Sequence, residues 1–427
     1  MAKYIPAIFL SLILFAGCSG SSQQTIRAYN ALGRGSHLDL ITDGYIVGIE
    51  KYKRQRIGNP ALGYPDRYKK LPNPGKNKLI SEQNREFTKA TSDGKSMLVT
   101  HIASYFPNRN YLYNAYSHGI EGHQNYEDGY AGLDRLQQDL RDRIMRADAQ
   151  SKPYSHIFIM SMGWNNDQYV SISRFNTILE KQIKATGVRS GGALRPLVIG
   201  FTWPSVWFSI EDSWLKKKLI GHFGSYINKS NDADEIGYSI ANWLINSQLP
   251  GIRAAVGPEK FPKVIAVGHS MGARILSRAI FSRDHLKTPI AEGTNIVDMY
   301  LGLQGAFSAR RFVAEDSGEG APYRNYATLS TRILLTASEN DKANPLAFWS
   351  KHVGGKNGLK YMRARSEFKI LAWPGEKGEV GEAIRNYDNN KIITIDATEI
   401  VKGDDAHNDI LNPKMAELIR FCLDQLD

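Results

Sequence analysis

The fold of this chain is decided by residues 263–276, which read Lys263-Val-Ile-Ala-Val-Gly-His-Ser-Met-Gly-Ala-Arg-Ile-Leu276. The apolar residues 264–267 predict a short buried strand, and residues 271–281 have the spacing of a helix. Between them, Ser270 stands in the pattern Gly-His-Ser-Met-Gly. A strand that turns sharply into a helix leaves no room for side chains beside the turn, so glycines are expected on either side. This context predicts that Ser270 is a nucleophile at the carboxyl edge of a sheet.

Short apolar strands alternate with amphipathic helices around this motif. The expected strands cover residues 156–161, 196–202, 263–267, 296–303, 332–337 and 391–396, and the expected helices cover residues 129–149, 171–186, 234–249, 271–281 and 413–425. Such alternation predicts an α/β fold with a mostly parallel central sheet and helices on both faces. Residues 83–90 and 96–105 read as an antiparallel N-terminal hairpin, because Asp93-Gly94 is a strong turn signal. Residues 31–80 show no clear period.

The first residues have the pattern of an export signal. Lys3 provides a positive charge, residues 5–15 are apolar, and the segment ends in Ala16-Gly17-Cys18. The apolar run is too short to cross a membrane as a helix. Its ending resembles the signal of a bacterial lipoprotein, in which the cysteine carries acyl chains such as palmitate and becomes the first residue of the mature protein. A plain secretory signal, cleaved near the cysteine, is the alternative.

The lipoprotein resemblance implies a location in the bacterial cell envelope. Residues 1–17 are then a signal peptide, Cys18 is the lipidation site, and the Ser/Gln-rich residues 18–30 form a flexible tether. Because Ser19 rather than an aspartate follows the cysteine, the resemblance implies the outer membrane, with the folded part facing the periplasm. Several acyl chains on one cysteine would hold the protein firmly at the membrane.

The chain is basic, with 54 Lys and Arg against 43 Asp and Glu and a formal charge of +11. Nucleic acid, an anionic membrane surface or solubility alone would explain such a charge. Because export argues against a nucleic-acid partner, we expect none. The basic runs at residues 51–56 and 216–218 are interpreted as solvated faces, with contact to anionic lipid headgroups as the alternative.

A serine hydroxyl needs a base to activate it, and the base needs an acid that orients it. Asp341 lies just past the expected strand at residues 332–337, and His407 lies between the last strand and the closing helix. We therefore interpret Ser270, Asp341 and His407 as a catalytic triad in the order serine, acid, histidine.

The acid has alternatives. Asp341 can instead cap a helix, and Glu339 is its nearest rival. Asp404 or Asp405 can orient His407 locally. The acidic residues around this histidine lack the spacing of a metal motif, so we expect neither a metal nor a cofactor.

The oxygen that becomes negative during acyl transfer needs two backbone N–H donors. One is expected from Met271, the residue after the nucleophile. The other is expected from the loop at residues 160–167, where Gly163 allows close approach, Trp164 is the first choice and Asn165 the next.

The remaining histidines and the second cysteine are given structural roles. Four other histidines, none of which follows the last expected strand, are interpreted as structural or surface residues: His101, His118, His123 and His269. Lipidation of Cys18 would leave Cys422 alone on the apolar face of the closing helix, where we expect inert core.

Together these residues resemble the α/β-hydrolase superfamily, in particular its lipase-like serine esterases. In that branch the third strand runs into a His-Gly-aromatic-Asn loop and the fourth strand ends near Trp-Pro-Ser. The matching stretches here are Met162-Gly-Trp-Asn165 and Phe201-Thr-Trp-Pro-Ser205. One departure is Met162, which stands where the family has histidine.

The resemblance implies hydrolysis of an ester through an acyl-enzyme, by one domain at residues 81–427 with insertions near residues 107–150 and 204–233. Residues 31–80 are then an N-terminal extension. An aromatic stretch follows the fourth strand, and we name Trp203 and Trp207 as candidates for lining an acyl pocket or lid.

Two readings of function and of the aromatic stretch stay open. Core packing of the aromatic residues is the alternative to a substrate pocket. With a lipid anchor, a membrane lipid or another acylated envelope molecule is the expected substrate. The alternative function is a non-catalytic binding or scaffold protein of the envelope on a hydrolase fold.

Overall fold

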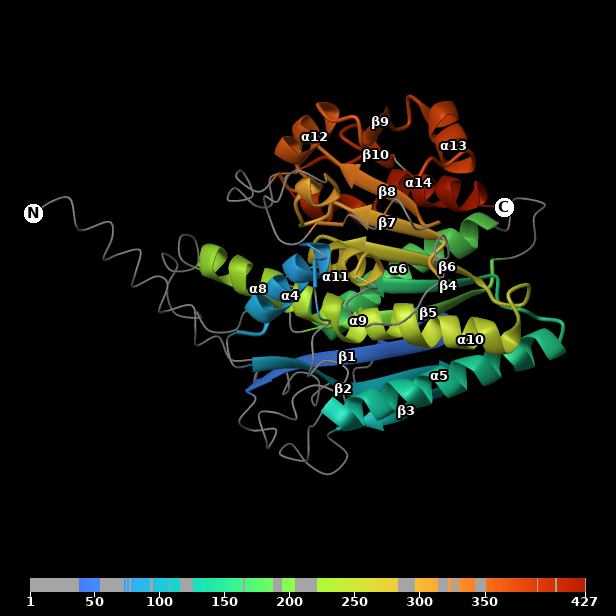
Figure 1. Cartoon of the computed structure of the whole chain (residues 1–427). Coiled ribbons are helices and arrows are strands. Elements are labelled where there is room, and N and C mark those ends of the chain that lie inside the picture. The colour runs from blue at the N-terminus through green and yellow to red at the C-terminus, as the bar shows by residue number, and fades with distance from the viewer. Residues whose placement is uncertain are drawn as a thin grey trace, which may run out of the picture.

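The computed structural model describes residues 38–53, 73, 75–76, 78–92, 95–106, 108–115, 126–163, 166–186, 194–203, 221–282, 296–313, 322–323, 326, 330–341, 351–389, 391–403 and 405–426. These residues form a ten-stranded sheet in the order β3-β2-β1-β5-β4-β6-β7-β8-β10-β9 (Figure 1). β2 pairs antiparallel with β1 and with β3. In the rest of the sheet, from β1 through β5, β4, β6, β7, β8 and β10 to β9, neighbouring strands are parallel. The strands are β1 (Gly44–Lys53), β2 (Lys95–Phe106), β3 (Asn108–Asn114), β4 (His156–Ser161), β5 (Pro196–Thr202), β6 (Lys263–His269), β7 (Met299–Leu303), β8 (Arg332–Ala337), β9 (Phe368–Ala372) and β10 (Ile392–Asp396).

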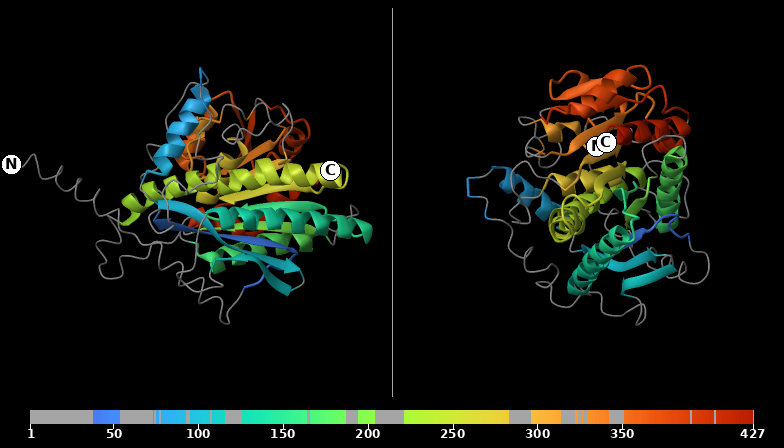
Figure 2. Two further views of the ribbon diagram at one scale, coloured as in Figure 1. Left: turned by 60° about the horizontal axis from the view of Figure 1, so that its bottom comes forward. Right: turned by 90° about the vertical axis from the view of Figure 1, so that its right-hand side faces the viewer.

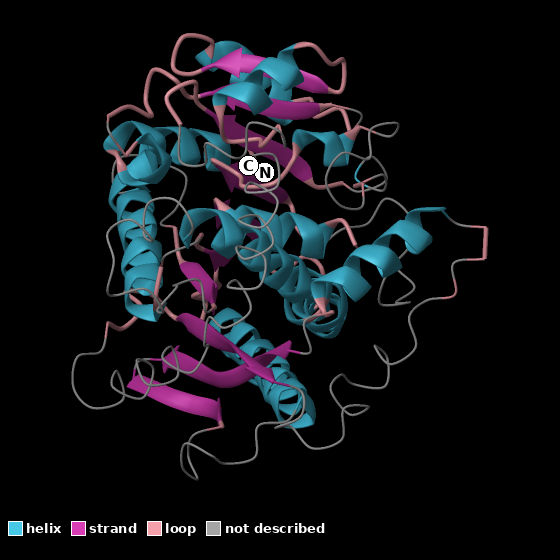
Figure 3. Cartoon of the chain, turned by 90° about the vertical axis from the view of Figure 1, so that its left-hand side faces the viewer, coloured by secondary structure: helices cyan, strands magenta, loops and turns pink. Residues whose placement is uncertain are grey.

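Helices cover both faces of this sheet (Figure 3). One face carries α5 (Tyr126–Ala149), α8 (Gly221–Tyr238), α9 (Ile240–Trp243), the π-helix η4 (Leu244–Gln248), α10 (Leu249–Val256), α11 (Met271–Ile280) and α12 (Lys356–Arg363). The other face carries α6 (Gln168–Thr186), α13 (Lys377–Arg385) and α14 (Pro413–Asp424). The remaining described helices are α4 (Lys78–Ala90), η6 (Ala309–Phe312) and η9 (Ala406–Leu411).

Each face has its own apolar core, because alternate residues of a strand point to opposite sides. In β6, Val264 and Ala266 belong to one core, and Ile265 and Val267 belong to the other. The predicted fold class is confirmed: the chain has a mostly parallel central sheet, helices on both faces and an antiparallel N-terminal edge.

The antiparallel edge is built from other residues than we expected. The prediction that residues 83–90 form the first strand of a hairpin is wrong, because they lie within α4. The segment has the spacing of a helix, with Gln83, Phe87 and Ala90 buried on one side. The strand expected at residues 96–105 is β2, which forms its hairpin with β3 instead. The expected turn at Asp93-Gly94 lies outside the described residues.

The other antiparallel partner, β1, comes from the region that showed no clear period. Residues 44–51 of this strand are buried on both sides, so the alternation typical of a half-buried strand is missing. The sheet therefore begins well before residue 81. One lysine of the basic run, Lys51, is buried in β1 and forms an ion pair with Asp232, so its expected place on a solvated face is wrong.

The other expected elements agree with the structure to differing degrees. The strands expected at residues 156–161, 196–202 and 332–337 have the observed bounds of β4, β5 and β8. The helix expected at residues 234–249 covers parts of the consecutive helices from α8 to α10. Figure 2 shows α5 lying along the β2–β3 edge. None of the described helices is both long and apolar enough to cross a membrane.

Candidate active site

Ser270 occupies the tight turn between β6 and α11. Its backbone angles are φ 55° and ψ −119°, in a region that residues other than glycine rarely adopt. The two flanking glycines make the turn possible. A Cβ atom on Gly272 would lie 2.0 Å from the main-chain oxygen of Ser161, and one on Gly268 would lie 2.4 Å from the Cα of Ala273. Such a strained turn is what exposes a serine hydroxyl at the edge of a sheet.

The end of β7 and the loop after it are hydrogen-bonded to the turn that carries Ser270. The N–H of Ser270 donates to the oxygen of Leu303 over 3.0 Å, and the N–H of Ala306 donates to the oxygen of Ser270 over 3.0 Å. Gln304, between these two partners, has a positive φ of 42° and is fully buried. The main chain around Ser270 is therefore held from both sides.

Asp341 and His407 are brought together after two neighbouring strands. Asp341 follows β8, and His407 lies in η9, which follows β10. β8 and β10 are paired in the sheet, so the loops at their carboxyl ends meet. His407 Nδ1 lies 2.8 Å from Asp341 Oδ2, and an ionised carboxylate can only accept a hydrogen bond. Nδ1 is then the protonated nitrogen, which leaves Nε2 as the basic one.

The rival acids have other partners or lie outside the described residues. Glu339 forms an ion pair with Arg363, with Oε1 and Nη1 2.8 Å apart. Asp405 accepts two hydrogen bonds from Asn408, at 3.0 and 2.9 Å. Asp404 is not among the described residues. In the described ranges, no group of three or more His, Cys, Asp or Glu side chains is placed to hold a metal ion.

His407 also lies against the turn that carries the serine. Its ring centroid is 4.9 Å from that of His269, the residue before Ser270. Between the described side chains of Ser270 and His407 there is no direct hydrogen bond. In enzymes without substrate, catalytic hydrogen bonds are often long and close only when the substrate binds.

One of the two expected oxyanion donors, Met271, and the glycine that precedes the other both lie next to this serine. Met271 is the first residue of α11, where backbone N–H groups have no partner within the helix. Gly163 lies directly beside Ser270, since a Cβ atom on this glycine would be 2.9 Å from Ser270 Oγ. Trp164 and Asn165, the next two residues, lie outside the described part of the chain.

The loop beside the serine is supported by hydrogen bonds to its main chain. Trp203 Nε1 donates to the oxygen of Met162 over 2.9 Å, and Asn166 Nδ2 donates to the oxygen of Gly163 over 2.9 Å. Only 2% of Trp203 is exposed, and it belongs to the apolar core. This position gives Trp203 a bracing role. Trp207 lies outside the described residues.

A buried histidine supports the helix that follows this loop. His101 Nε2 lies 2.9 Å from Nε2 of Gln168, the first residue of α6, and its ring fills the space that a side chain on Gly48 would need. Burial lowers the pKa of His101 to about 4, and the charge of Arg109 adds to this shift.

The buried His101 should make stability depend on pH. Its pKa is lower in the folded chain than the ordinary value of about 6.5. Its contribution to the free energy of unfolding is therefore fully present above about pH 6.5 and falls as the pH drops toward 4. We expect His101→Gln to reduce the slope of the unfolding free energy between these pH values. Urea titrations at several pH values measure the slope, and an unchanged slope in the variant would contradict the assignment.

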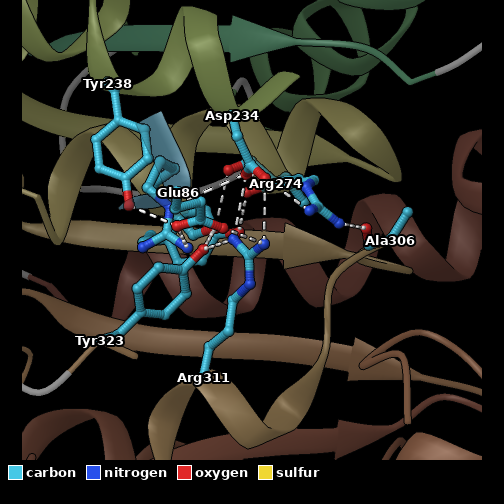
Figure 4. Close-up of polar contacts among 11 residues, drawn as sticks. Glu86, Asp234, Tyr238, Arg274, Ala306, Arg311 and Tyr323 are labelled. Atoms are coloured by element: carbon cyan, nitrogen blue, oxygen red, sulfur yellow. Dashed lines mark hydrogen bonds and ion pairs between the residues drawn. The ribbon is translucent and has the colours of Figure 1, made fainter. Parts of the chain in front are cut away.

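A buried group of charged residues is centred on Asp234 of α8 (Figure 4). Its carboxylate accepts two hydrogen bonds from Arg274 of α11, at 2.9 and 2.6 Å, and two from Arg311 of η6, at 3.2 and 3.3 Å. Burial alone would raise the pKa of Asp234, but the charges of Arg274 and Arg311 outweigh it and hold the pKa well below its usual range. Arg274 Nη1 also lies 3.5 Å from the main-chain oxygen of Ala306. The N–H of the same residue donates to the main-chain oxygen of Ser270.

Further residues join this group to the N-terminal part of the chain. Arg311 Nη2 and Arg278 Nη2 bind Glu86 of α4, over 3.1 and 2.7 Å, and the hydroxyl of Tyr238 donates to Glu86 over 2.5 Å. We did not predict this network, because its members are far apart in the sequence and follow no local pattern. Five residues make up the buried network: Glu86, Asp234, Arg274, Arg278 and Arg311.

The remaining predicted residues fall into two groups. Cys422 is a buried free thiol in α14, as expected, and burial raises its pKa well above the ordinary value. Cys18, the signal segment and the tether lie outside the described residues, as do His118 and His123.

Comparisons with known proteins find only distant similarity. No protein-family model matches the chain, and no curated protein sequence matches it. Among solved structures, the chain is similar to a cutinase from Trichoderma reesei in complex with a C11Y4 phosphonate inhibitor, with 12% sequence identity and a TM-score of 0.18. The match covers 47% of this chain and 75% of the cutinase chain.

Proposed function

We propose that this protein is a serine hydrolase that cleaves carboxylic esters, with Ser270, His407 and Asp341 as its catalytic triad. The observation that carries the proposal is the 2.8 Å contact between His407 Nδ1 and Asp341 Oδ2, at the sheet edge where Ser270 occupies a strained turn. A strained backbone at a serine and a half-buried acid–base pair in one place are typical of catalytic sites.

The proposed mechanism uses each group in turn. Ser270 Oγ attacks the ester carbonyl while His407 Nε2 takes its proton, and the carbonyl oxygen becomes an oxyanion. The N–H of Met271 and a second N–H from the loop after Gly163 stabilise this charge. His407 then returns the proton to the leaving alcohol, and water releases the acyl group from Ser270 by the reverse sequence. Asp341 orients the imidazole and stabilises its charged form.

The location of the enzyme and its substrate class are proposed from the sequence alone. A lipid anchor at Cys18 would hold the enzyme at the envelope membrane, where membrane lipids and acylated molecules are the abundant esters. Trp203 is buried in the core and donates a hydrogen bond to the main chain of Met162. Trp207, which lies outside the described residues, is therefore the aromatic candidate for an acyl pocket.

A second candidate function is a non-catalytic binding or scaffold protein. The observation in its favour is that no hydrogen bond joins Ser270 to His407 in this structure. A hydrolase fold without turnover would have the same architecture, since fold alone does not establish activity.

Labelling by a fluorophosphonate probe separates the two functions. Because the probe reacts only with an activated serine, we expect the folded wild-type chain to be labelled, Ser270→Ala to lose all labelling, and the control Ser366→Ala, at an exposed serine, to keep it. Mass spectrometry of the labelled chain locates the adduct. A folded wild-type chain that takes up no probe would rule out the hydrolase and favour the scaffold.

A further inference from the structure

His269 is attached to the main chain of the proposed base. Its Nε2 lies 2.8 Å from the main-chain oxygen of His407. A carbonyl oxygen can only accept, so the Nε2–H of His269 is the donor. The residue is buried, with 1% exposed, and a hydrogen bond in such a low-dielectric site is electrostatically stronger than one in water. The turn that carries the nucleophile therefore also holds the turn that carries the base.

Two attachments at different points fix His407. Asp341 holds the ring at Nδ1, and His269 holds the main-chain oxygen of the same residue. A ring held only at Nδ1 could still swing with its main chain, because η9 is a short 3₁₀ turn. Arg174 of α6 fixes the next residue, donating from Nη1 to Asn408 Oδ1 over 2.8 Å. These contacts restrict where His407 Nε2 points.

The charge around His269 suits this role. Burial lowers the pKa of His269 well below its ordinary value, and the proximity of His407 and of Arg174 lowers it further. Among the described residues, Asp341, from the loop after β8, binds His407, and Asp405, which precedes η9, acts on the charge of Arg174. Because His269 stays neutral, it donates its hydrogen bond without placing a positive charge beside the imidazolium that forms on His407.

We propose that His269 is a positioning residue for the catalytic base: it binds the main-chain oxygen of His407 and thereby directs Nε2 of that residue toward Ser270. The proposal rests on the hydrolase function proposed above. From the sequence, we interpreted His269 only as a structural or surface residue, since it does not follow the last expected strand.

Two amide substitutions test this role with closely matched chemistry. The side-chain nitrogen of glutamine reaches about as far as Nε2 of histidine, whereas that of asparagine reaches only as far as Nδ1. We expect His269→Gln to keep kcat within a few-fold of wild type and His269→Asn to lower kcat on the order of 10- to 100-fold, because small displacements of a catalytic group cost about this much. KM for a short-chain ester should change little in either variant.

The measurements are kcat and KM with a chromogenic ester, together with thermal unfolding of both variants. Rescue by glutamine, at unfolding temperatures that match those of the asparagine variant, would support positioning. Equal kcat in His269→Asn and wild type would overturn it, as would equal losses of kcat in both variants. A wild-type chain without labelling or turnover would instead refute the hydrolase function itself, so the two failures are distinguishable.

Discussion

Asp341→Asn is expected to lower kcat about 10⁴-fold, the effect of removing the orienting carboxylate from a serine triad. The amide can present its NH₂ group to His407 Nδ1, which favours the tautomer with the proton on Nε2 and blocks that nitrogen from accepting the proton of Ser270. KM should change much less than kcat, because the carboxylate acts in the transition state rather than in substrate binding. Steady-state hydrolysis of a chromogenic ester measures both constants.

The rival acid Glu339 provides a matched control. It lies two residues away, and its carboxylate binds Arg363 at the surface, with 40% of the side chain exposed. We expect Glu339→Gln to leave kcat within about twofold of wild type, because exposed ion pairs contribute little. If Asp404→Asn abolished turnover while Asp341→Asn did not, the acid would have to be reassigned.

Asp234→Ala is expected to destabilise the fold by about 3–5 kcal/mol, the usual result of removing one partner from a buried ion pair. Arg274 and Arg311 would lose the carboxylate that accepts their hydrogen bonds. The midpoint of urea unfolding should fall sharply. The control is Asp142→Ala, whose pair with Arg141 lies at the surface with 52% of the Asp142 side chain exposed. We expect the control to change stability by about 0.5 kcal/mol or less.

The same variant should alter the response to acid. Because the pKa of Asp234 is lower in the folded chain, its stabilising effect is present above the unfolded value of about 4 and is lost as pH falls through the folded value. The stability difference between wild type and Asp234→Ala should therefore narrow below about pH 4. Equal unfolding midpoints for Asp234→Ala and Asp142→Ala at neutral pH would contradict the role of the network.

Six of the parallel strands could be predicted because each is short and apolar, and β4, β5 and β8 have the predicted bounds. The edge strand β9 was not predicted, because it is only partly buried. β1 was missed since both of its faces are buried and Gly48 interrupts it to make room for His101. The segment at residues 83–90 was misread as a strand because a turn signal followed it, although Gln83 and Phe87 already had helical spacing.

The candidate site was predictable in its order along the chain but not in its contacts. Ser270 stood in a recognisable pattern, and Asp341 and His407 followed later strands. The bond from His269 to the main chain of His407 joins residues 138 positions apart, and no local pattern encodes it. The network around Asp234 was hidden for the same reason. Long-range polar contacts of this kind can be predicted only once the order of the strands in the sheet is known.

The place of β1 in the sheet has a consequence for shortened forms of this protein. β1 pairs with β2 on one side and with β5 on the other, so a chain that started after Lys53 would expose the backbone N–H and C=O groups of two inner strands. Unprotected edges of this kind template pairing between molecules and lead to aggregation. Any form produced for crystallisation or assay therefore has to retain the residues from Gly44 onward, although the sequence resemblance alone placed the start of the hydrolase near residue 81.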